Sequence, residues 1–466
     1  MKIINKSILS IMASALLLVS CNEDFLDVDK TDGYEAADTE TVTPEQMVNG
    51  VYGYLTDWTY AFSYLGVTEI ISDNADKGSS ASDTGSDKDV LDNLTFTASA
   101  SSVLGVWQTW YKTIGRATIS IDYTENYGIT DESYKNRLIG EAKFLRALNY
   151  FWLVRSFGDV PLQHIDYVIR QPKEDVYAFI EQDLLDAIDA LPLKSEYDSE
   201  DLGRATKGAA QALLSKVYLY EEKYQEAYDM ANNVINSGEY SLAADYSTLW
   251  HADTENGVES IFEVQGRGES IAHGVQQYSQ TQGVRGQFGW GFNIPSQNLL
   301  DAFNEEGDEI RRDATIIFPG ETLWDGTVII SNPENPMYSE KAYSSANGGA
   351  EDTDKNVRML RYAEILLIKA EAAVELGMDG SEPLNQVRER VNLDDISNPT
   401  LEDIWKERRL ELAFEHDRWF DLVRTGQASD AMAADGKTFV TGKHELFPIP
   451  NNQLIQTPEM EQNPGW

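Results

Sequence analysis

The spacing of apolar residues predicts helices, most clearly between Ala205 and Ile235. Two consecutive sets there each fall on one helical face: Ala210, Leu214, Val217 and Tyr218, then Tyr224, Ala227, Ala231 and Val234. Their order of small and aromatic positions is that of a tetratricopeptide unit, with Ser215 where Gly is usual. One unit leaves an apolar face uncovered, so we expect further hairpins to stack on it. An ordinary antiparallel helix pair in an all-α protein is the alternative.

Similar patterns at both ends of the chain predict a helical-repeat scaffold. Thr43 and Pro44 suit an N-cap and a first helical position, and Gly158 followed by Pro161 ends a helix that starts near Leu138. Further helices are predicted at about 107–123, 174–191, 297–303, 358–376, 382–391 and 401–424, a short strand at 260–265, and a long Ser/Asp/Gly loop at 72–93. The predicted fold class is all-α dominated, a tetratricopeptide-like scaffold of about four helical hairpins over residues 44–236 and 358–424. A long loop-rich insertion at about 260–350, with short strands, completes it.

The N-terminus has the composition of an export signal. Lys2 and Lys6 precede an apolar run from Ile8 to Val19 that is too short to span a bilayer. Residues 18–21, Leu-Val-Ser-Cys, resemble the lipobox of bacterial lipoproteins, which would make Cys21 the lipid-bearing first residue of the mature chain. We therefore expect a signal peptide at 1–20, a lipidated tether at 21–43 and one domain at 44–466. A secreted protein cleaved elsewhere, with Cys21 incidental, is the alternative.

The charge balance excludes some partners. The sequence has 37 Lys and Arg against 78 Asp and Glu, a net charge of −41. So acidic a surface repels phosphate backbones and no basic stripe interrupts it, so nucleic acid is not an expected partner. The single Cys also excludes a disulfide within the chain.

The motifs of catalysis and metal binding are missing from the sequence. The five His have no HExxH spacing, and neither a GxSxG sequence nor a phosphate-binding loop occurs. The Asp residues between Ser82 and Asp89 miss the order of an EF-hand loop, so we predict no metal site and no cofactor, with calcium at this loop left open. A charged set shares one side of the predicted last helix and is interpreted as a partly buried ion network of alternating sign, with catalysis as the alternative: Arg408, Glu411, Glu415 and Arg418.

Seven stretches occur along nearly the whole mature chain in an order that resembles one known family. They are EAKFLRA (141–147), FGDVPL (157–162), LRYAEILL (360–367), ERRLELAFE (407–415), RWFDLVR (418–424), LFPIP (446–450) and QNPGW (462–466). The family is that of the SusD/RagB nutrient-binding outer-membrane lipoproteins. The resemblance implies a cell-surface lipoprotein of a Gram-negative bacterium that sits on a SusC-like TonB-dependent transporter and binds its ligand without cleaving it.

The resemblance also indicates where a ligand would bind. Trp290, between two glycines, lies where the starch-binding relative has a sugar-stacking Trp. Aromatic rings stack on the C–H face of a sugar, whereas its hydroxyls need polar partners. The candidate ligand-binding residues are Trp290, Tyr278, Gln276, Arg285 and Gln287 in one stretch, Asp73, Asn74 and Asp76 across the cleft, and Trp324 in a Gly-bounded turn. Residues 77–89 lack the aromatic of that relative's first loop, so its starch specificity is not carried over.

We therefore predict a surface lipoprotein that captures an oligosaccharide and passes it to a SusC-like transporter, making no bond itself. Peptide capture, which other members of the family perform, is the first alternative. A glycan-cleaving enzyme on a helical scaffold and a purely structural scaffold are the others. The acidity of the chain argues against polyanionic glycans.

Overall fold

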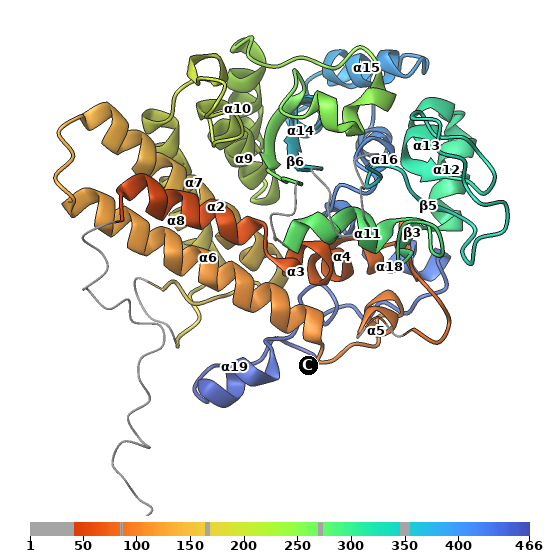
Figure 1. Ribbon diagram of the computed structural model, residues 1–466, viewed down its shortest axis with the longest axis horizontal. Helices are drawn as coiled ribbons and strands as arrows, with labels where there is room; N and C mark the ends of the chain where they lie inside the picture. The colour runs from red at the N-terminus through yellow and green to blue at the C-terminus, as the bar shows by residue number, and fades with distance from the viewer. Residues whose placement is uncertain (1–41, 84, 86, 164–167, 269–273, 345–354) are drawn as a thin grey trace, which may run out of the picture.

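The computed structural model describes residues 42–466 apart from 84, 86, 164–167, 269–273 and 345–354. The predicted signal peptide at 1–20 and most of the predicted tether, including Cys21, lie outside the described residues. Helices dominate the described part and its strands are short, which confirms the predicted fold class (Figure 1).

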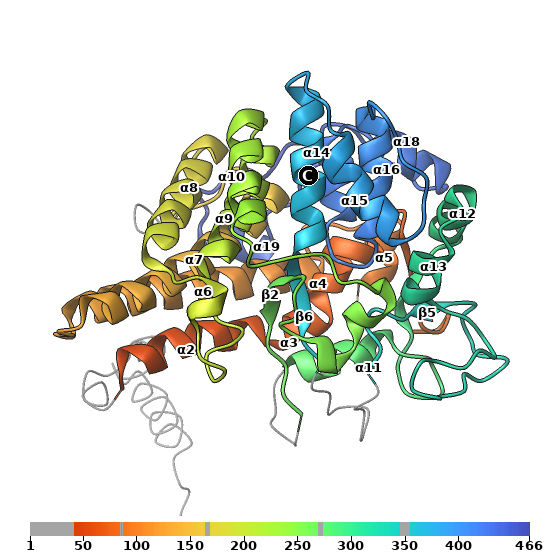
Figure 2. The same cartoon turned by 90° about the horizontal axis from the view of Figure 1, so that it is seen from above.

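The scaffold is a row of helices packed against one another. Its members are α2 Pro44–Leu55, α6 Ser101–Asn126, α7 Glu132–Phe157, α8 Lys173–Ala190, α9 Lys207–Tyr220, α10 Tyr224–Asn236, α14 Tyr362–Glu375 and α15 Ser381–Arg390. Helix α7 packs on both α6 and α8, and α9 with α10 forms the predicted hairpin. Since α10 also packs on α14, the C-terminal pair α14–α15 continues the stack begun by the N-terminal helices. Figure 2 shows α8, α10 and α14 side by side, with α2 along the opposite edge.

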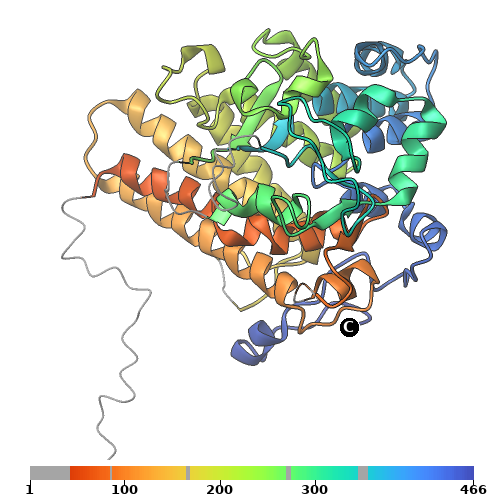
Figure 3. The same cartoon turned by 45° about the vertical axis from the view of Figure 1, so that its right-hand side comes forward.

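Shorter elements fill the space beside this row. The helical ones are α3 Trp58–Ala61, α4 Ser63–Leu65, the π-helix η3 Gly66–Ile70, α5 Lys88–Asp92, η4 Lys194–Glu196, η5 Tyr246–Trp250, η6 Ala252–Thr254, η7 Gly274–Gln277, α11 Tyr278–Gln282, α12 Gln297–Glu306, α13 Glu309–Thr315, α16 Leu401–Glu411, α17 Arg418–Arg424, α18 Ala428–Ala434 and α19 Asn451–Gln456. The strands are β1 Ala75–Gly78, β2 Ser260–Val264, β3 Phe292–Pro295, β4 Ile316–Ile317, β5 Tyr338–Ser339 and β6 Val357–Arg361. They form three antiparallel pairs in the described residues, β1–β3, β2–β6 and β4–β5. Figure 3 shows α12 and α13, in teal, at the edge of the molecule.

Local signals predicted the ends of several helices correctly. Thr43 caps α2, accepting from the backbone N–H of Gln46 while the Gln46 side chain bonds back to Thr43. Gly158 ends α7 with a φ of 70°, a conformation that glycine adopts without strain. Two segments differ from prediction: residues 357–361 are the strand β6 rather than helix, and the predicted loop at 72–93 contains β1 and α5.

The predicted last helix at 401–424 is wrong, because the chain breaks it after Glu411. Phe414 and His416 take positive φ values of 64° and 73°, and α17 starts only at Arg418. The turn carries Asp417 into the core, where its carboxylate pairs with Arg155 of α7 at 2.8 Å. A continuous helix could not deliver Asp417 there, so this buried ion pair accounts for the break.

The four charged residues of this segment are buried or nearly so, but they do not pair with one another as predicted. Glu411 is fully buried and its carboxylate lies 2.9 Å from Arg361, 3.1 Å from Arg311 and 2.5 Å from Arg390. Burial alone would raise the pKa of Glu411, but the three guanidinium groups outweigh it and hold that pKa well below its ordinary value. The partners of the other three are Asp421 for Arg408, Lys341 and Arg361 for Glu415, and Asp73 for Arg418.

Replacing Glu411 with Ala should lower the free energy of unfolding by about 3–5 kcal/mol, because it leaves three buried guanidinium groups without their shared carboxylate. Urea denaturation of both proteins measures the difference. The matched control is Glu389→Ala, an exposed Glu on α15, which should change stability by no more than about 0.5 kcal/mol. Equal stabilities for the two variants would contradict the structural role of Glu411.

Candidate functional site

Two tryptophan side chains meet at the surface, where α3 approaches the loop before β3. The ring centroids of Trp58 and Trp290 lie 6.0 Å apart, with their planes at 67°. Trp58 is 39% exposed and Trp290 is half-buried. Trp58 also stacks on Phe62, with centroids 5.4 Å apart and planes at 16°. We call this exposed aromatic surface the Trp58–Trp290 pair.

A close backbone contact fixes the position of Trp58. The side chain of Asp57 caps the first turn of α3. The N–H of Val275 donates to the carbonyl of Thr56 at 3.0 Å, which ties η7 to the chain just before α3. A Cβ at Gly274 would lie 1.9 Å from the backbone nitrogen of Trp58, so glycine alone fits there.

A buried cation lies beneath the stack. The Lys88 ammonium is 3.8 Å from the centroid of Phe62, whose ring also meets Phe292 edge to face at 5.4 Å. Lys88 donates to Ser102 Oγ at 2.7 Å and lies 3.4 Å from Asp87. Burial lowers the pKa of Lys88 to about 8. A cation on an aromatic face in a desolvated place contributes roughly 2 kcal/mol, which helps to hold Phe62 under Trp58.

The loop of Trp290 is braced from within. The backbone N–H of Trp290 donates to the Gln280 carbonyl at 2.8 Å, and Arg285 Nη1 donates to the Trp290 carbonyl at 3.0 Å. A Cβ at Gly289 would lie 2.4 Å from the backbone of Gly283, so the loop closes tightly on itself. The indole therefore projects from a rigid turn rather than from a free loop.

Arg285 and Gln287, both predicted site residues, lie in this loop with Trp290. Arg285 donates to Ser79 Oγ at 2.8 Å and pairs with Glu334 at 2.9 Å. Gln287 is exposed and its amide donates to the Val328 carbonyl at 2.8 Å. Both residues are at least partly exposed in the same loop as Trp290, although each side chain already has protein partners.

Tyr278, Asp73 and Asn74 are buried instead of lining the surface. The Tyr278 hydroxyl bonds His416 Nε2 at 2.9 Å, and only 5% of the residue is exposed. Asp73 receives two bonds of 2.8 Å from Arg418, and Asn74 accepts one of 2.9 Å from Arg409. Asp73 and Asn74 thus hold α17 and α16 against the segment before β1, and Tyr278 holds the turn at His416.

The remaining predicted residues lie in three separate places. Asp76 is half-buried in β1, where burial, and next the neighbouring Asp92, raise its pKa to about 6. Trp324 is 45% exposed and stacks on His251, with ring centroids 3.8 Å apart. Gln276 belongs to η7, next to α11. Of the predicted residues, Trp290, Arg285 and Gln287 thus share one loop, and Arg285 contacts the Trp290 backbone.

Sequence reasoning missed Trp58, which lies between two polar residues directly after α2. The available signal is the capping Asp57 before a large aromatic residue at the start of a very short helix. No group of three or more His, Cys, Asp or Glu that could hold a metal ion occurs among the described residues.

Comparison with known proteins identifies two family profiles that together match most of the chain. Residues 258–466 match the profile described as "SusD family". Residues 24–219 match one described as "Starch-binding associating with outer membrane".

Full-length relatives match as well. SusD-like protein P2 of Formosa agariphila is 29% identical, over 91% of this chain and 93% of its own. The starch-binding protein SusD of Bacteroides thetaiotaomicron is 26% identical, over 74% of this chain and 75% of its own. Among solved structures, a laminarin-binding SusD-like protein is 29% identical with a TM-score of 0.79, covering 92% of this chain and 99% of that one. Surface glycan-binding protein A of Bacteroides fluxus is 26% identical, also with a TM-score of 0.79, covering 91% and 99%.

Replacing the carboxylate of Asp73 or of Asp76 by an uncharged amide should change the stability of the fold in opposite directions. Burial opposes the charge of Asp73, but Arg418 and Arg409 outweigh it and lower its pKa to about 2. The folded pKa lies below the ordinary 3.8, so the stabilisation is complete above pH 3.8 and disappears as the pH falls toward 2. Asp73→Asn should therefore cost about 2 kcal/mol at pH 7, measured by thermal and urea unfolding, and the loss should shrink at acid pH.

Asp76→Asn is the matched control, three residues along the chain. Because the pKa of Asp76 is raised, its charge opposes folding at pH 7, and this variant should be at least as stable as the wild type. A stability loss for Asp76→Asn as large as that for Asp73→Asn would contradict the assignment.

Proposed function

Because the chain belongs to the SusD family, we propose that it captures an oligosaccharide at the Trp58–Trp290 pair and delivers it to an outer-membrane transporter. The starch-binding, laminarin-binding and glycan-binding relatives are binding proteins by name, and this chain is likewise a binding protein rather than an enzyme. The observation that carries the proposal is the pair itself. It is a pair of indoles on a rigid support, with Trp58 substantially open to solvent.

Stacking explains why such a pair suits a sugar. Phe62 covers one face of Trp58, so a ligand ring can lie on the other. The C–H groups of a sugar face give this contact its apolar part, and the hydroxyls at the ring edge need hydrogen-bonding partners. Arg285 and Gln287 are the partners on the same loop as Trp290. Tyr278, Asp73 and Asn74 support the site from below, while Asp76, Gln276 and Trp324 remain predictions.

The charge of the chain favours an uncharged ligand. A net charge of −41 repels sulfated or uronate-rich glycans, and Arg285, the cation nearest Trp290, is already paired with Glu334. Starch and laminarin, the ligands in the names of two relatives, are uncharged glucans. We therefore propose that the ligands are neutral glycans.

Attachment to the outer membrane completes the proposal. No helix in the described part of the chain has the length and apolar character needed to cross a membrane. We propose that lipid on Cys21 anchors the mature chain at the cell surface and that residues 21–43 act as the tether. A SusC-like TonB-dependent transporter is the proposed partner. Support comes from the lipobox-like sequence and from the family description that names the outer membrane.

Replacing either Trp58 or Trp290 with Ala should weaken glycan binding about tenfold or more, because each removal takes away one stacking ring. Calorimetry with a panel of neutral glycans, acidic glycans and peptides, using the mature chain without Cys21, measures the change. Melting temperatures should stay close to that of the wild type.

The control for this experiment is Tyr127→Ala, which removes an aromatic residue of similar exposure, 45%, directly after α6. It should leave the affinity unchanged. Binding of peptides and not glycans would establish the alternative ligand class, and release of reducing ends from a glycan would overturn the non-enzymatic assignment.

Replacing Cys21 with Ala should move the protein from the membrane fraction to the soluble fraction, because the lipid anchor cannot form. Immunoblotting of fractionated cells measures the distribution. Ser20→Gly, which keeps a small residue before the Cys, is the matched control and should stay in the membrane fraction. A Cys21→Ala protein still bound to membranes would show that Cys21 is incidental.

A further inference from the structure

A hollow with a volume of about 270 Å³ opens next to Thr56, two residues before Trp58. It lies between the C-terminal half of α2, residues 200–204 and the end of β2. Its lining residues are Asn49, Tyr52, Gly53, Leu55, Thr56, Glu200, Leu202, Gly203, Arg204, Glu263, Val264 and Gln265. This volume is close to the ~300 Å³ at which small-molecule sites begin.

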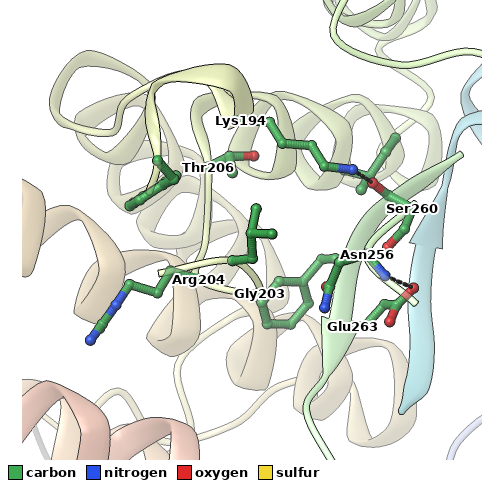
Figure 4. Close-up of a pocket in the computed structure, with 11 residues that line it drawn as sticks. Lys194, Gly203, Arg204, Thr206, Asn256, Ser260 and Glu263 are labelled. Atoms are coloured by element: carbon green, nitrogen blue, oxygen red, sulfur yellow. Dashed lines mark hydrogen bonds between the residues drawn. The ribbon is translucent and has the colours of Figure 1, made fainter. Parts of the chain in front are cut away.

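A smaller cavity of about 20 Å³ shares Leu202, Gly203, Arg204 and Glu263 with the hollow (Figure 4). Internal polar contacts occupy its wall: Lys194 donates to the Ser260 carbonyl at 2.9 Å, and the N–H of Asn256 to Glu263 at 3.2 Å. In Figure 4 the Arg204 side chain points away from this cavity. The small cavity has room for about one water molecule, so the larger hollow is the one that can accept a ligand.

Glycine keeps the floor of the hollow open. Helix α2 exposes Gly50 and Gly53, although each costs about 1 kcal/mol of helix stability relative to Ala. A Cβ at either position would meet nothing within 4 Å, so packing does not require glycine at either site. Gly53 lines the hollow and Gly50 does not. Because Gly53 belongs to the lining and the space around its Cβ is open, a larger side chain there would add bulk at the hollow.

The walls combine apolar surface with fixed polar groups. Tyr52 and Leu55 face Leu202, which is 45% exposed. Asn49 accepts from Arg204 through its Oδ1 at 3.0 Å, so its amide N–H groups remain as donors. The Gln265 amide is held by Asn256 at 2.9 and 3.1 Å. Such a mixture suits a hydroxylated ring, which presents both C–H and O–H groups.

The charges at the hollow disfavour anions. Glu200 and Glu263 line it, and Arg204 is its one lining cation among the described residues. The Arg204 guanidinium already pairs with Glu45 and Glu141, each at 3.0 Å. A ligand carboxylate or sulfate would therefore find no cation that lacks a carboxylate partner, whereas an uncharged ligand meets no repulsion.

We propose that the hollow is a second subsite for an uncharged sugar unit, belonging to the glycan chain whose neighbouring part stacks on the Trp58–Trp290 pair. The inference rests on the proposed function. Thr56 lines the hollow and Trp58 follows two residues later, so their Cα atoms are at most about 7 Å apart. A chain of several sugar units can therefore reach both places at once, and affinity should rise with chain length until both are filled.

Filling the hollow tests this subsite. The ligands are linear gluco-oligosaccharides of two to eight units, prepared from laminarin and from starch. Gly53→Leu should lower the affinity for the longest of them about tenfold. Affinity for the shortest ones should not change. Gly50→Leu is the matched control, with the same substitution on the same helix outside the hollow, and should bind all lengths as the wild type does. Both variants should be at least as stable as the wild type, because Leu is a better helix former than Gly.

Gly53→Ala adds one carbon to the same place and should keep most of the affinity, so the loss should increase with the size of the side chain. The subsite is overturned if Gly53→Leu binds every length as the wild type does, or if wild-type affinity does not depend on length. Those outcomes leave the proposed function intact when Trp58→Ala still weakens glycan binding about tenfold or more. If the wild type binds no glycan of the panel, the proposed function fails together with the subsite.

Discussion

The carboxylate of Glu411 fixes how α13, β6, α15 and α16 dock against one another. It is fully buried and pairs with Arg311 after α12, Arg361 at the end of β6 and Arg390 at the end of α15. Three elements, whose arginines lie 21, 50 and 100 residues from Glu411 in sequence, thus converge on one group of α16. A buried charge without its partners costs several kcal/mol, so the elements that supply the arginines are constrained to dock together.

The chain after α16 connects the Glu411 ion network with the strands next to Trp290. After α16 the chain turns at Phe414 and His416, and α17 presents Arg418 to Asp73. Next to this ion pair, the Ser296 hydroxyl donates to the backbone carbonyl of Asp73 at 2.7 Å, and the Ser296 N–H donates to that of Asn74 at 3.0 Å. This aligns β1 with β3, and β3 starts two residues after Trp290. The strand that follows Trp290 is therefore held partly by ion pairs that lie away from the aromatic surface, whereas Trp58 is held by its local backbone contacts.

The scaffold could be predicted from the sequence because its signals are local. A helical hairpin at 205–235 follows from apolar spacing, and the ends at Thr43 and Gly158 follow from capping chemistry. The break after Glu411 could not, because it accompanies the pairing of Asp417 with Arg155 and Lys216, which lie 262 and 201 residues from Asp417 in sequence. The candidate site divides in the same way. Trp290 between two glycines is visible in the sequence, while Trp58 joins it only through the contact of α3 with η7. Asp73 and Tyr278 have residue types suited to ligand binding, but in the structure Asp73 pairs with Arg418 and Tyr278 bonds a histidine, so both stabilise the fold.

A protein that hands its ligand on must release it, and this limits how strong any one contact can be. Two indole rings offer only a few kcal/mol, which corresponds to weak binding. Affinity can still rise if further weak subsites act on one chain, because each additional unit binds at the high effective concentration set by the first. Such binding can also be undone stepwise, since each unit leaves its subsite over a small barrier. A hollow with no unpaired cation in its described lining and a shallow aromatic surface fit this requirement better than a deep pocket that binds a ligand through direct ion pairs, from which a ligand leaves slowly.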